Sequence, residues 1–173
     1  MALTIGIDVG GTNIRFGVFN GHQLIDELRL EANLSLLCAE VAPEHSSYEI
    51  IRLLSGQIIA LIEKHDDIAG VGIGFPGFIH PETKKIMQSP NLPGLDYFNL
   101  GNELSAILSL PVVIENDAVA AAYGEYCLLK LGKSNVEKES LIYIGLGTGV
   151  GGGLIHAGQL FLGQHGVDRK SVV

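Results

Sequence analysis

One stretch decides the fold of this chain: Ile5-Gly-Ile-Asp-Val-Gly-Gly-Thr-Asn-Ile-Arg-Phe-Gly-Val-Phe-Asn20. It predicts two β-strands, at 3–9 and 14–19, because both runs are apolar and β-branched. The turn between them is Gly10-Gly11-Thr12-Asn13, in which two glycines permit positive φ and leave backbone N–H groups unshielded. Such a turn, with the Thr12 hydroxyl, can hold a phosphate. Paired glycines also mark plain β-hairpins, so both interpretations stay open at this point.

A single acidic residue, Asp8, lies at the end of the first predicted strand, which is expected to be buried. A carboxylate is the wrong group for a core unless it has a partner. A divalent cation is the obvious candidate, because hard cations take oxygen ligands.

Length and charge bound the function. The chain has 173 residues, enough for one domain with a sizeable core, or for one domain and part of another. Eleven basic against nineteen acidic residues give a net charge of −8, which argues against a nucleic-acid or anionic-membrane partner. The start lacks the basic segment of a signal peptide, and no apolar run is long enough for a membrane span. We therefore expect a cytoplasmic protein.

The remaining elements follow from hydrophobic periodicity and turn residues. The expected order is β-β-β-α-β-α-β-α, followed by a new strand and a second glycine loop. This is not a Rossmann order, in which the glycine loop joins a strand to a helix. Both loops here join strands, and the pattern resembles one lobe of the two-lobed actin-like ATPase architecture. The expected strands are 3–9, 14–19, 24–30, 68–75, 112–115 and 140–144, the helices 46–64, 100–108 and 118–131, the irregular stretches 31–47, 76–98 and 132–138, and the glycine loop 145–153. A capping-box pattern, Ser46 with Glu49, predicts the start of the first helix.

The tripeptide Glu115-Asn116-Asp117 is the most informative for chemistry. It lies where a strand ends and a helix begins, the position at which α/β proteins place ligand sites. Asp117 could be the helix N-cap and nothing more. Three consecutive hydrogen-bond acceptors exceed what capping needs, however. A carboxylate here could accept a proton from an alcohol that attacks a phosphoryl group.

Two Pro/Gly segments, Gly74-Phe-Pro-Gly77 and Ser89-Pro-Asn-Leu-Pro-Gly94, bound the long loop. Turn chemistry explains both segments fully. The functional interpretation is that Gly77 lets a ligand approach the backbone, and that Asn91 offers an amide to hydroxyl groups. For Arg15 the sequence predicts no more than pairing with a carboxylate.

Together these pieces resemble the ROK family of sugar kinases and sugar-responsive repressors. The order and spacing of the motifs match the family to about Gly166. The matching stretches are Asp8-Val-Gly-Gly-Thr12, Gly74-Phe-Pro-Gly77, Ser89-Pro-Asn-Leu92, Glu115-Asn-Asp-Ala118 running into Ala120-Ala-Ala-Tyr-Gly-Glu125, and Leu146-Gly-Thr-Gly-Val-Gly-Gly-Gly153.

The resemblance implies an actin-like (ribonuclease H-like) α/β fold with a mixed sheet, and transfer of the ATP γ-phosphoryl group to a hexose hydroxyl, usually O6. The implied partners are ATP, Mg²⁺ and a hexose or N-acetylhexosamine, and the sugar itself stays open. Asp117 would be the general base. Gly77, Asn91 and Asn116 would hold the sugar; Asp8 would serve Mg²⁺; Gly10, Gly11, Thr12 and Asn13 would hold phosphates, opposed by Gly147, Thr148 and Gly149.

The match departs from the family at the end of the chain. Gly163-Gln-His-Gly166 leads into 167–173, without the family's sugar-binding Glu and His, its zinc ligands or its adenine pocket. We expect an N-terminal lobe at 1–131, a truncated start of the C-terminal lobe at 139–173, and little activity from this chain alone. Whether this end is natural or the result of a frameshift is left open. Val119, where many members have Asn, is a smaller departure.

A lone lobe would expose the apolar face of 141–162, so the sequence predicts a homodimer that covers it. Two alternatives to a kinase stay open: a non-catalytic sugar-responsive regulator of the same family, and another branch of actin-like ATPases.

Overall fold

A computed structural model describes residues 2–90, 92, 94–131, 140–146, 150–161 and 170–171. The elements, in chain order, are β1 (Leu3–Val9), β2 (Asn13–Asn20), β3 (Gln23–Glu31), α1 (Leu34–Glu40), α2 (Pro43–Lys64), β4 (Ile68–Phe75), β5 (Phe78–Ile79), β6 (Ile86–Gln88), α3 (Leu100–Leu108), β7 (Val112–Asn116), α4 (Asp117–Lys130), β8 (Leu141–Leu146), β9 (Val150–His156), β10 (Gln159–Leu160) and β11 (Lys170–Ser171).

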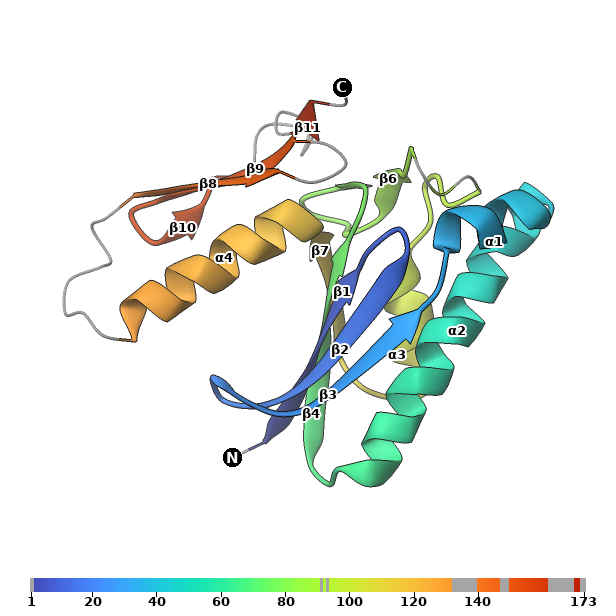
Figure 1. Ribbon diagram of the computed structural model, residues 1–173, viewed down its shortest axis with the longest axis horizontal. Coiled ribbons are helices and arrows are strands. Elements are labelled where there is room, and N and C mark those ends of the chain that lie inside the picture. Colours follow the sequence, from blue (N-terminus) through green and yellow to red (C-terminus); the bar gives the residue numbers. More distant parts are fainter. Residues whose placement is uncertain are drawn as a thin grey trace.

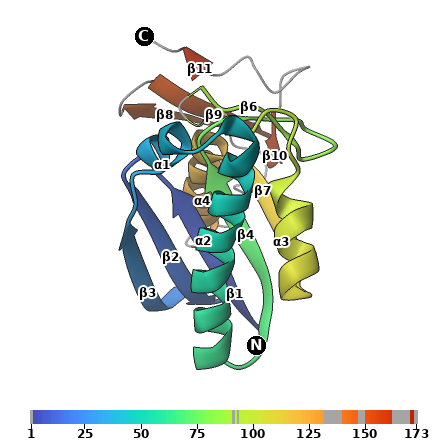
Figure 2. The same cartoon turned by 90° about the vertical axis from the view of Figure 1, so that its right-hand side faces the viewer.

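The main sheet has five strands in the order β3-β2-β1-β4-β7 (Figure 1). The first three form an antiparallel meander, and β1, β4 and β7 run parallel. Alternate residues of each strand point to the same face, and one face is packed against α1, α2 and α3 (Figure 2). The core on this face includes Phe16, Phe75 and Ile114 from the strands and Leu54 and Ile58 from α2, all fully buried.

The other face of the sheet, here called the outer face, is covered only in part. Helix α4 crosses it and contacts β4 and β7 on one side and β8 and β9 on the other (Figure 1). The contact with β9 is very close. A Cβ added at Gly153 would lie 2.4 Å from the Cβ of Ala122, and one at Gly151 would lie 2.8 Å from the Cβ of Ala118. The alanines of α4 and the glycines of β9 therefore form one matched contact between helix and strand.

The stretch 31–47 is not irregular as expected, because it contains α1. Asn33 caps this helix by accepting from the backbone N–H of Leu36 at 3.0 Å. The expected capping box at Ser46 is wrong. Helix α2 begins at Pro43, whose fixed φ suits the first helical turn, and its N-cap, Ala42, makes no side-chain bond. Ser46 is instead buried inside the second turn.

Two further expectations are corrected. The long loop 76–98 contains a small antiparallel hairpin, β5–β6, so it is not structureless. The end of the expected glycine loop 145–153 belongs to β9, which begins at Val150. The expected linker 132–138 lies outside the described residues.

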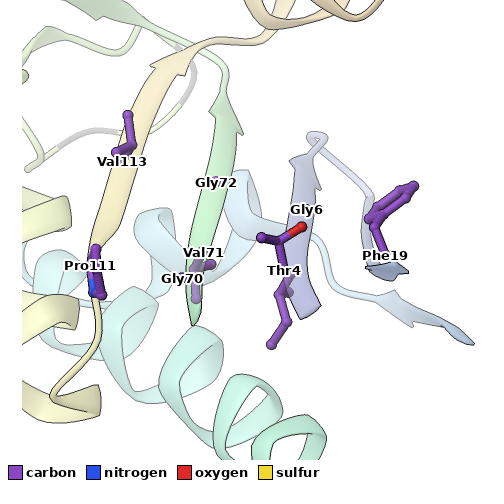
Figure 3. A pocket seen from close by; sticks show the side chains of 9 residues that line it. Thr4, Gly6, Phe19, Gly70, Val71, Gly72, Pro111 and Val113 are labelled. Atoms are coloured by element: carbon purple, nitrogen blue, oxygen red, sulfur yellow. The ribbon is translucent and has the colours of Figure 1, made fainter. Parts of the chain in front are cut away.

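The outer face also has a hollow, which lies nearer the amino ends of the parallel strands and is lined by β1, β2, β4 and β7 (Figure 3). Three of its nine lining residues are glycines, and none of the nine can titrate, so the hollow offers no group for acid–base chemistry. The residues that line it are Thr4, Ile5, Gly6, Phe19, Gly70, Val71, Gly72, Pro111 and Val113.

Strand β8 exposes an unusually apolar face. Ile142, Ile144 and Leu146 alternate along the strand and are 74%, 67% and 82% exposed. Their neighbours Leu141 and Tyr143 point the opposite way and are partly buried. No helix within the described ranges is long and apolar enough to cross a membrane.

Candidate functional site

A row of charged side chains runs across the outer face at the carboxyl ends of the parallel strands. The register pairs Arg29 with Arg15, Arg15 with Asp8, Asp8 with Gly74 and Gly74 with Glu115. Directly paired residues point to the same face, so the five positions form one line across five strands. Gly74 has no side chain, and α4 lies over this position: a Cβ there would lie 3.6 Å from the Cβ of Ala120 and 3.6 Å from the Cα of Asp117.

Asp8 is exposed on this line, although it was expected at the end of a buried strand. The alternation of β1 explains the difference, since Ile7 and Val9 point into the core and Asp8 points away from it. An exposed carboxylate beside a phosphate-type turn fits Mg²⁺, which binds through one or two carboxylates together with substrate phosphates. Among the described residues, no group of three or more His, Cys, Asp or Glu side chains could hold a metal ion.

Backbone and side-chain hydrogen bonds hold the phosphate-type turn in shape. The N–H of Gly10 donates to the carbonyl of Asn13 at 2.9 Å, and a Cβ at Gly10 would lie 2.8 Å from that oxygen. Neither glycine of the turn uses the positive φ that the sequence allowed. Gly11 has open space at its Cβ position, so a ligand can approach its backbone. The Asn13 amide donates to Thr12 Oγ1 at 3.1 Å, and Arg29 Nε donates to Asn13 Oδ1 at 3.1 Å.

The β7–α4 junction brings Asn116 and Asp117 together. Asn116, not Asp117, is the N-cap of α4: its Oδ1 accepts from the N–H groups of Ala118 and Val119 at 3.1 and 3.2 Å. The interpretation of Asp117 as a cap and nothing more is therefore wrong. Asp117 Oδ1 accepts from Asn116 Nδ2 and from the Ala118 N–H, both at 2.9 Å. These two donors fix the orientation of the carboxylate.

Gly77 is drawn into the same cluster through its carbonyl, which accepts from Asn116 Nδ2 at 2.9 Å. A Cβ at Gly77 would lie 2.9 Å from the carbonyl oxygen of Gln88. The close approach that requires glycine here is therefore that of the returning strand β6, rather than that of a ligand. Ser89 closes the same hairpin by donating its hydroxyl to the Pro76 carbonyl at 2.7 Å.

Two basic residues of this region were missed or underrated by sequence reasoning. For Arg15 the sequence predicts only a carboxylate partner, yet within the described parts of the chain it makes no ion pair and is exposed opposite Asp8 in the register. The hairpin register could have revealed this, because a turn after Val9 pairs these two positions. Lys84, from the long loop, lies 2.7 Å from Glu115 Oε2, and no sequence pattern signals that contact.

Four of the expected site residues cannot be placed. Asn91, Gly147, Thr148 and Gly149 lie outside the described residues. The expected residues that the structure describes form two groups at the same edge of the sheet: the phosphate-type turn with Asp8, and the cluster of Gly77, Asn116 and Asp117.

Comparison with known proteins identifies the family of this chain. The ROK family model matches residues 4–170. A glucokinase of Streptomyces coelicolor is 36% identical over 170 residues, which cover 98% of this chain and 49% of that protein. The chain thus spans about half the length of the curated relatives it matches.

Solved structures agree on the fold. A ROK family glucokinase from Streptomyces griseus, in complex with glucose and AMPPNP, superposes with a TM-score of 0.76 at 31% identity, over 98% of this chain and 49% of that one. A ROK family transcriptional regulator, a homologue of the E. coli MLC protein, reaches a TM-score of 0.76 at 18% identity, over 97% of this chain and 40% of that one. The second likeness shows the fold alone. The expected actin-like α/β fold is confirmed, and the chain belongs to the ROK family.

Proposed function

We propose that this chain supplies the sugar-binding and base-bearing half of an ATP-dependent sugar kinase that phosphorylates a hexose, with glucose O6 the first candidate. One observation carries the proposal. Asn116 joins the Asp117 carboxylate to the Gly77 carbonyl at the carboxyl edge of the sheet. Asn116 directly follows Glu115, which lies in the same row across the sheet as Asp8. The cluster combines a carboxylate, an amide and a backbone carbonyl, which suit a polyhydroxyl substrate.

Asp117 acts in this proposal as the general base. Its carboxylate accepts the proton of the attacking sugar hydroxyl as that oxygen bonds to the γ-phosphorus and the bond from phosphorus to the β–γ bridging oxygen breaks. Asn116 orients the carboxylate, and Asn116, Gly77 and Asn91 hold neighbouring hydroxyls. Phosphoryl transfer needs in-line positioning and charge neutralisation more than covalent chemistry, and fixed polar groups provide both.

The phosphates of ATP are assigned to the turn formed by Gly10, Gly11, Thr12 and Asn13, with Gly147, Thr148 and Gly149 as the opposing loop. Asp8 would hold Mg²⁺, which supplies neutralisation of phosphate charge when bound. Arg15 lies in the register position next to Asp8 and is available to a phosphate oxygen.

The organisation of the protein belongs to the same proposal. We assign 1–131 to an N-terminal lobe and 139–173 to the start of a second lobe, in a cytoplasmic protein. The exposed face of Ile142, Ile144 and Leu146 supports a homodimer, since so much apolar surface is rarely left in water.

The test measures coupled ADP release across a hexose and N-acetylhexosamine panel. It uses this chain and a chimera in which the remaining half of the S. coelicolor glucokinase follows it. We expect turnover from the chimera, and a loss of about 10²-fold or more in kcat for Asp117→Asn. The matched control is Asp66→Asn, at an exposed carboxylate in the turn after α2. A chimera that binds sugar but never releases ADP would support the regulator instead.

A further inference from the structure

One lysine of the long loop, Lys84, has a backbone conformation that residues with a side chain rarely adopt. Lys84 lies in the turn between β5 and β6 with a φ of 54°, in the left-handed region. A residue with a Cβ is strained there, and glycine is the usual choice. Its ammonium nevertheless makes a definite contact: Nζ lies 2.7 Å from Oε2 of Glu115, in a pair whose side chains are 34% and 21% exposed.

The turn itself is fixed by its own hydrogen bonds. The N–H of Lys84 donates to the His80 carbonyl at 3.0 Å, and the N–H of His80 donates to the Lys85 carbonyl at 2.9 Å. The amide of Asn99 donates to the Thr83 carbonyl at 3.2 Å and ties the turn to the start of α3. Lys84 is therefore held at a defined point, from which its side chain spans the gap to the end of β7.

Glu115 connects Lys84 to the candidate site. Its Oε2 binds Lys84, while its Oε1 accepts from the backbone N–H of Asn116 at 2.9 Å. Asn116 in turn binds the Gly77 carbonyl and the Asp117 carboxylate through Nδ2. A continuous series of hydrogen bonds thus links the hairpin turn to the proposed base. Hydrogen bonds in such a series polarise one another and are strengthened by it.

We propose that Lys84 is a positioning residue for the sugar site: by pairing with Glu115 it fixes the backbone and side chain of Asn116, and through Asn116 the Asp117 carboxylate. This inference rests on the proposed function for its consequence, the affinity for sugar. Its structural part, the ordering of Asn116, stands independently. The charge explains why a lysine occupies a left-handed position where glycine would fit without strain.

The chain offers a set of variants that separate charge from turn stability. Lys84→Gly removes the charge and the strain together, so the turn is kept or improved while the ion pair is lost. Lys84→Met removes the charge and keeps the apolar stem, and Lys84→Arg keeps the charge. Lys85→Met is the matched control, because Lys85 is the exposed neighbour in the same turn and makes no ion pair within the described residues.

The first measurement is the exchange of the Asn116 side-chain amide protons with water, followed by NMR on the free chain. We expect exchange to rise about fivefold in Lys84→Gly and Lys84→Met, the size that a partly exposed ion pair supports. Lys84→Arg should restore slow exchange, and Lys85→Met should match the wild type. The second measurement is calorimetric titration of the chain and of the chimera with D-glucose and with N-acetyl-D-glucosamine. Lys84→Gly and Lys84→Met should bind the sugar about fivefold more weakly than the wild type.

A Lys84→Gly variant with wild-type amide exchange would overturn the proposal, because the ion pair would then fix nothing beyond itself. Faster exchange with unchanged sugar affinity would overturn it as well, since the ordering would not reach the site. If the wild-type chain and the chimera bind neither sugar, the proposed function fails, and the exchange measurement still decides whether Lys84 orders Asn116.

Discussion

The side-chain amide of Asn116 donates to the main-chain carbonyl of Gly77 across 2.9 Å, between residues that are 39 positions apart in the chain. This bond ties the turn after β4 to the end of β7, where α4 begins; β4 and β7 are parallel neighbours in the main sheet. The same side chain caps α4 through its oxygen. One amide therefore holds two segments and a helix start in a single arrangement, and the polar cluster depends on it.

Asn116→Ala removes the helix cap and the bond to Gly77 together. We expect the free energy of unfolding to fall by about 1–2 kcal/mol, the usual effect of losing an N-cap, measured by urea denaturation. Asn116→Asp keeps the oxygen that caps α4 but sets a carboxylate oxygen against the Gly77 carbonyl and the Asp117 carboxylate, so it should not restore the lost stability. The control is Asn102→Ala, on α3. Equal stabilities of the Asn116→Ala and control proteins would contradict the double role of Asn116.

Gly153→Ala tests the contact between α4 and β9. The new methyl group would lie 2.4 Å from the Cβ of Ala122, so the strand must move from the helix. We expect a destabilisation of about 1–3 kcal/mol, as in other overpacked contacts, measured as a lowered thermal midpoint. Gly124→Ala is the matched control. Gly124 lies on α4, the helix that carries Ala122, and nothing lies within 4 Å of its Cβ position. It should be neutral or mildly stabilising. Ala122→Gly combined with Gly153→Ala should restore part of the loss.

A charged cluster at the far end of α2 predicts an acid-sensitive contact. The Lys64 ammonium and the His65 ring each lie 2.7 Å from Asp26 Oδ2, and with Lys64 as the larger cause they lower the pKa of Asp26 from 3.8 to about 2. A lowered carboxyl pKa stabilises the fold above the unfolded-state value, and this stabilisation is lost as the pH falls through the folded-state value. We expect stability to decline between about pH 4 and pH 2.

The measurement for Asp26 is urea denaturation at a series of pH values. In Asp26→Asn the loss of stability between about pH 4 and pH 2 should be smaller, and the rest of the pH profile should be unchanged. An unchanged slope in the variant would show that other carboxyl groups cause the acid sensitivity.

Arg15→Ala tests the exposed basic residue beside Asp8. If Arg15 contacts a phosphate, the dissociation constant for Mg·ATP, measured by calorimetry with the chimera, should rise by about tenfold or more. Arg52→Ala is the matched control, since Arg52 is paired with Glu49 on α2. Its affinity for the nucleotide should equal that of the wild type, and the same result for Arg15→Ala would remove Arg15 from the site.

Ile144→Glu tests the proposed homodimer. The substitution places a charge in the middle of the exposed apolar face of β8, where desolvation in an interface would be costly. We expect sedimentation velocity to show a dimer for the wild type and a monomer for Ile144→Glu. Ile107→Glu, at a half-exposed residue of α3, should stay dimeric. A wild-type monomer would end the dimer proposal.

Several features of this protein follow from local sequence. Apolar alternation and β-branched residues predict β1 and β4, and the stripe at 51–62 predicts α2, because side-chain periods of 2 and 3.6 are set by backbone geometry. The motifs around Asp8 and Asn116 identify the family. Local sequence also predicts a ligand site at the junction of β7 and α4, since it lies at the carboxyl end of a parallel strand.

Tertiary structure decided the rest, because it depends on contacts between segments far apart in the chain. Gly77 and Gly153 are glycines because β6 and α4 lie against them. The row from Arg29 to Glu115 exists only once five strands are in register. The pair of Lys84 with Glu115 joins residues 31 positions apart, and no local period encodes that distance. Sequence determined which chemistry the chain carries, whereas packing and register decided which of its groups meet.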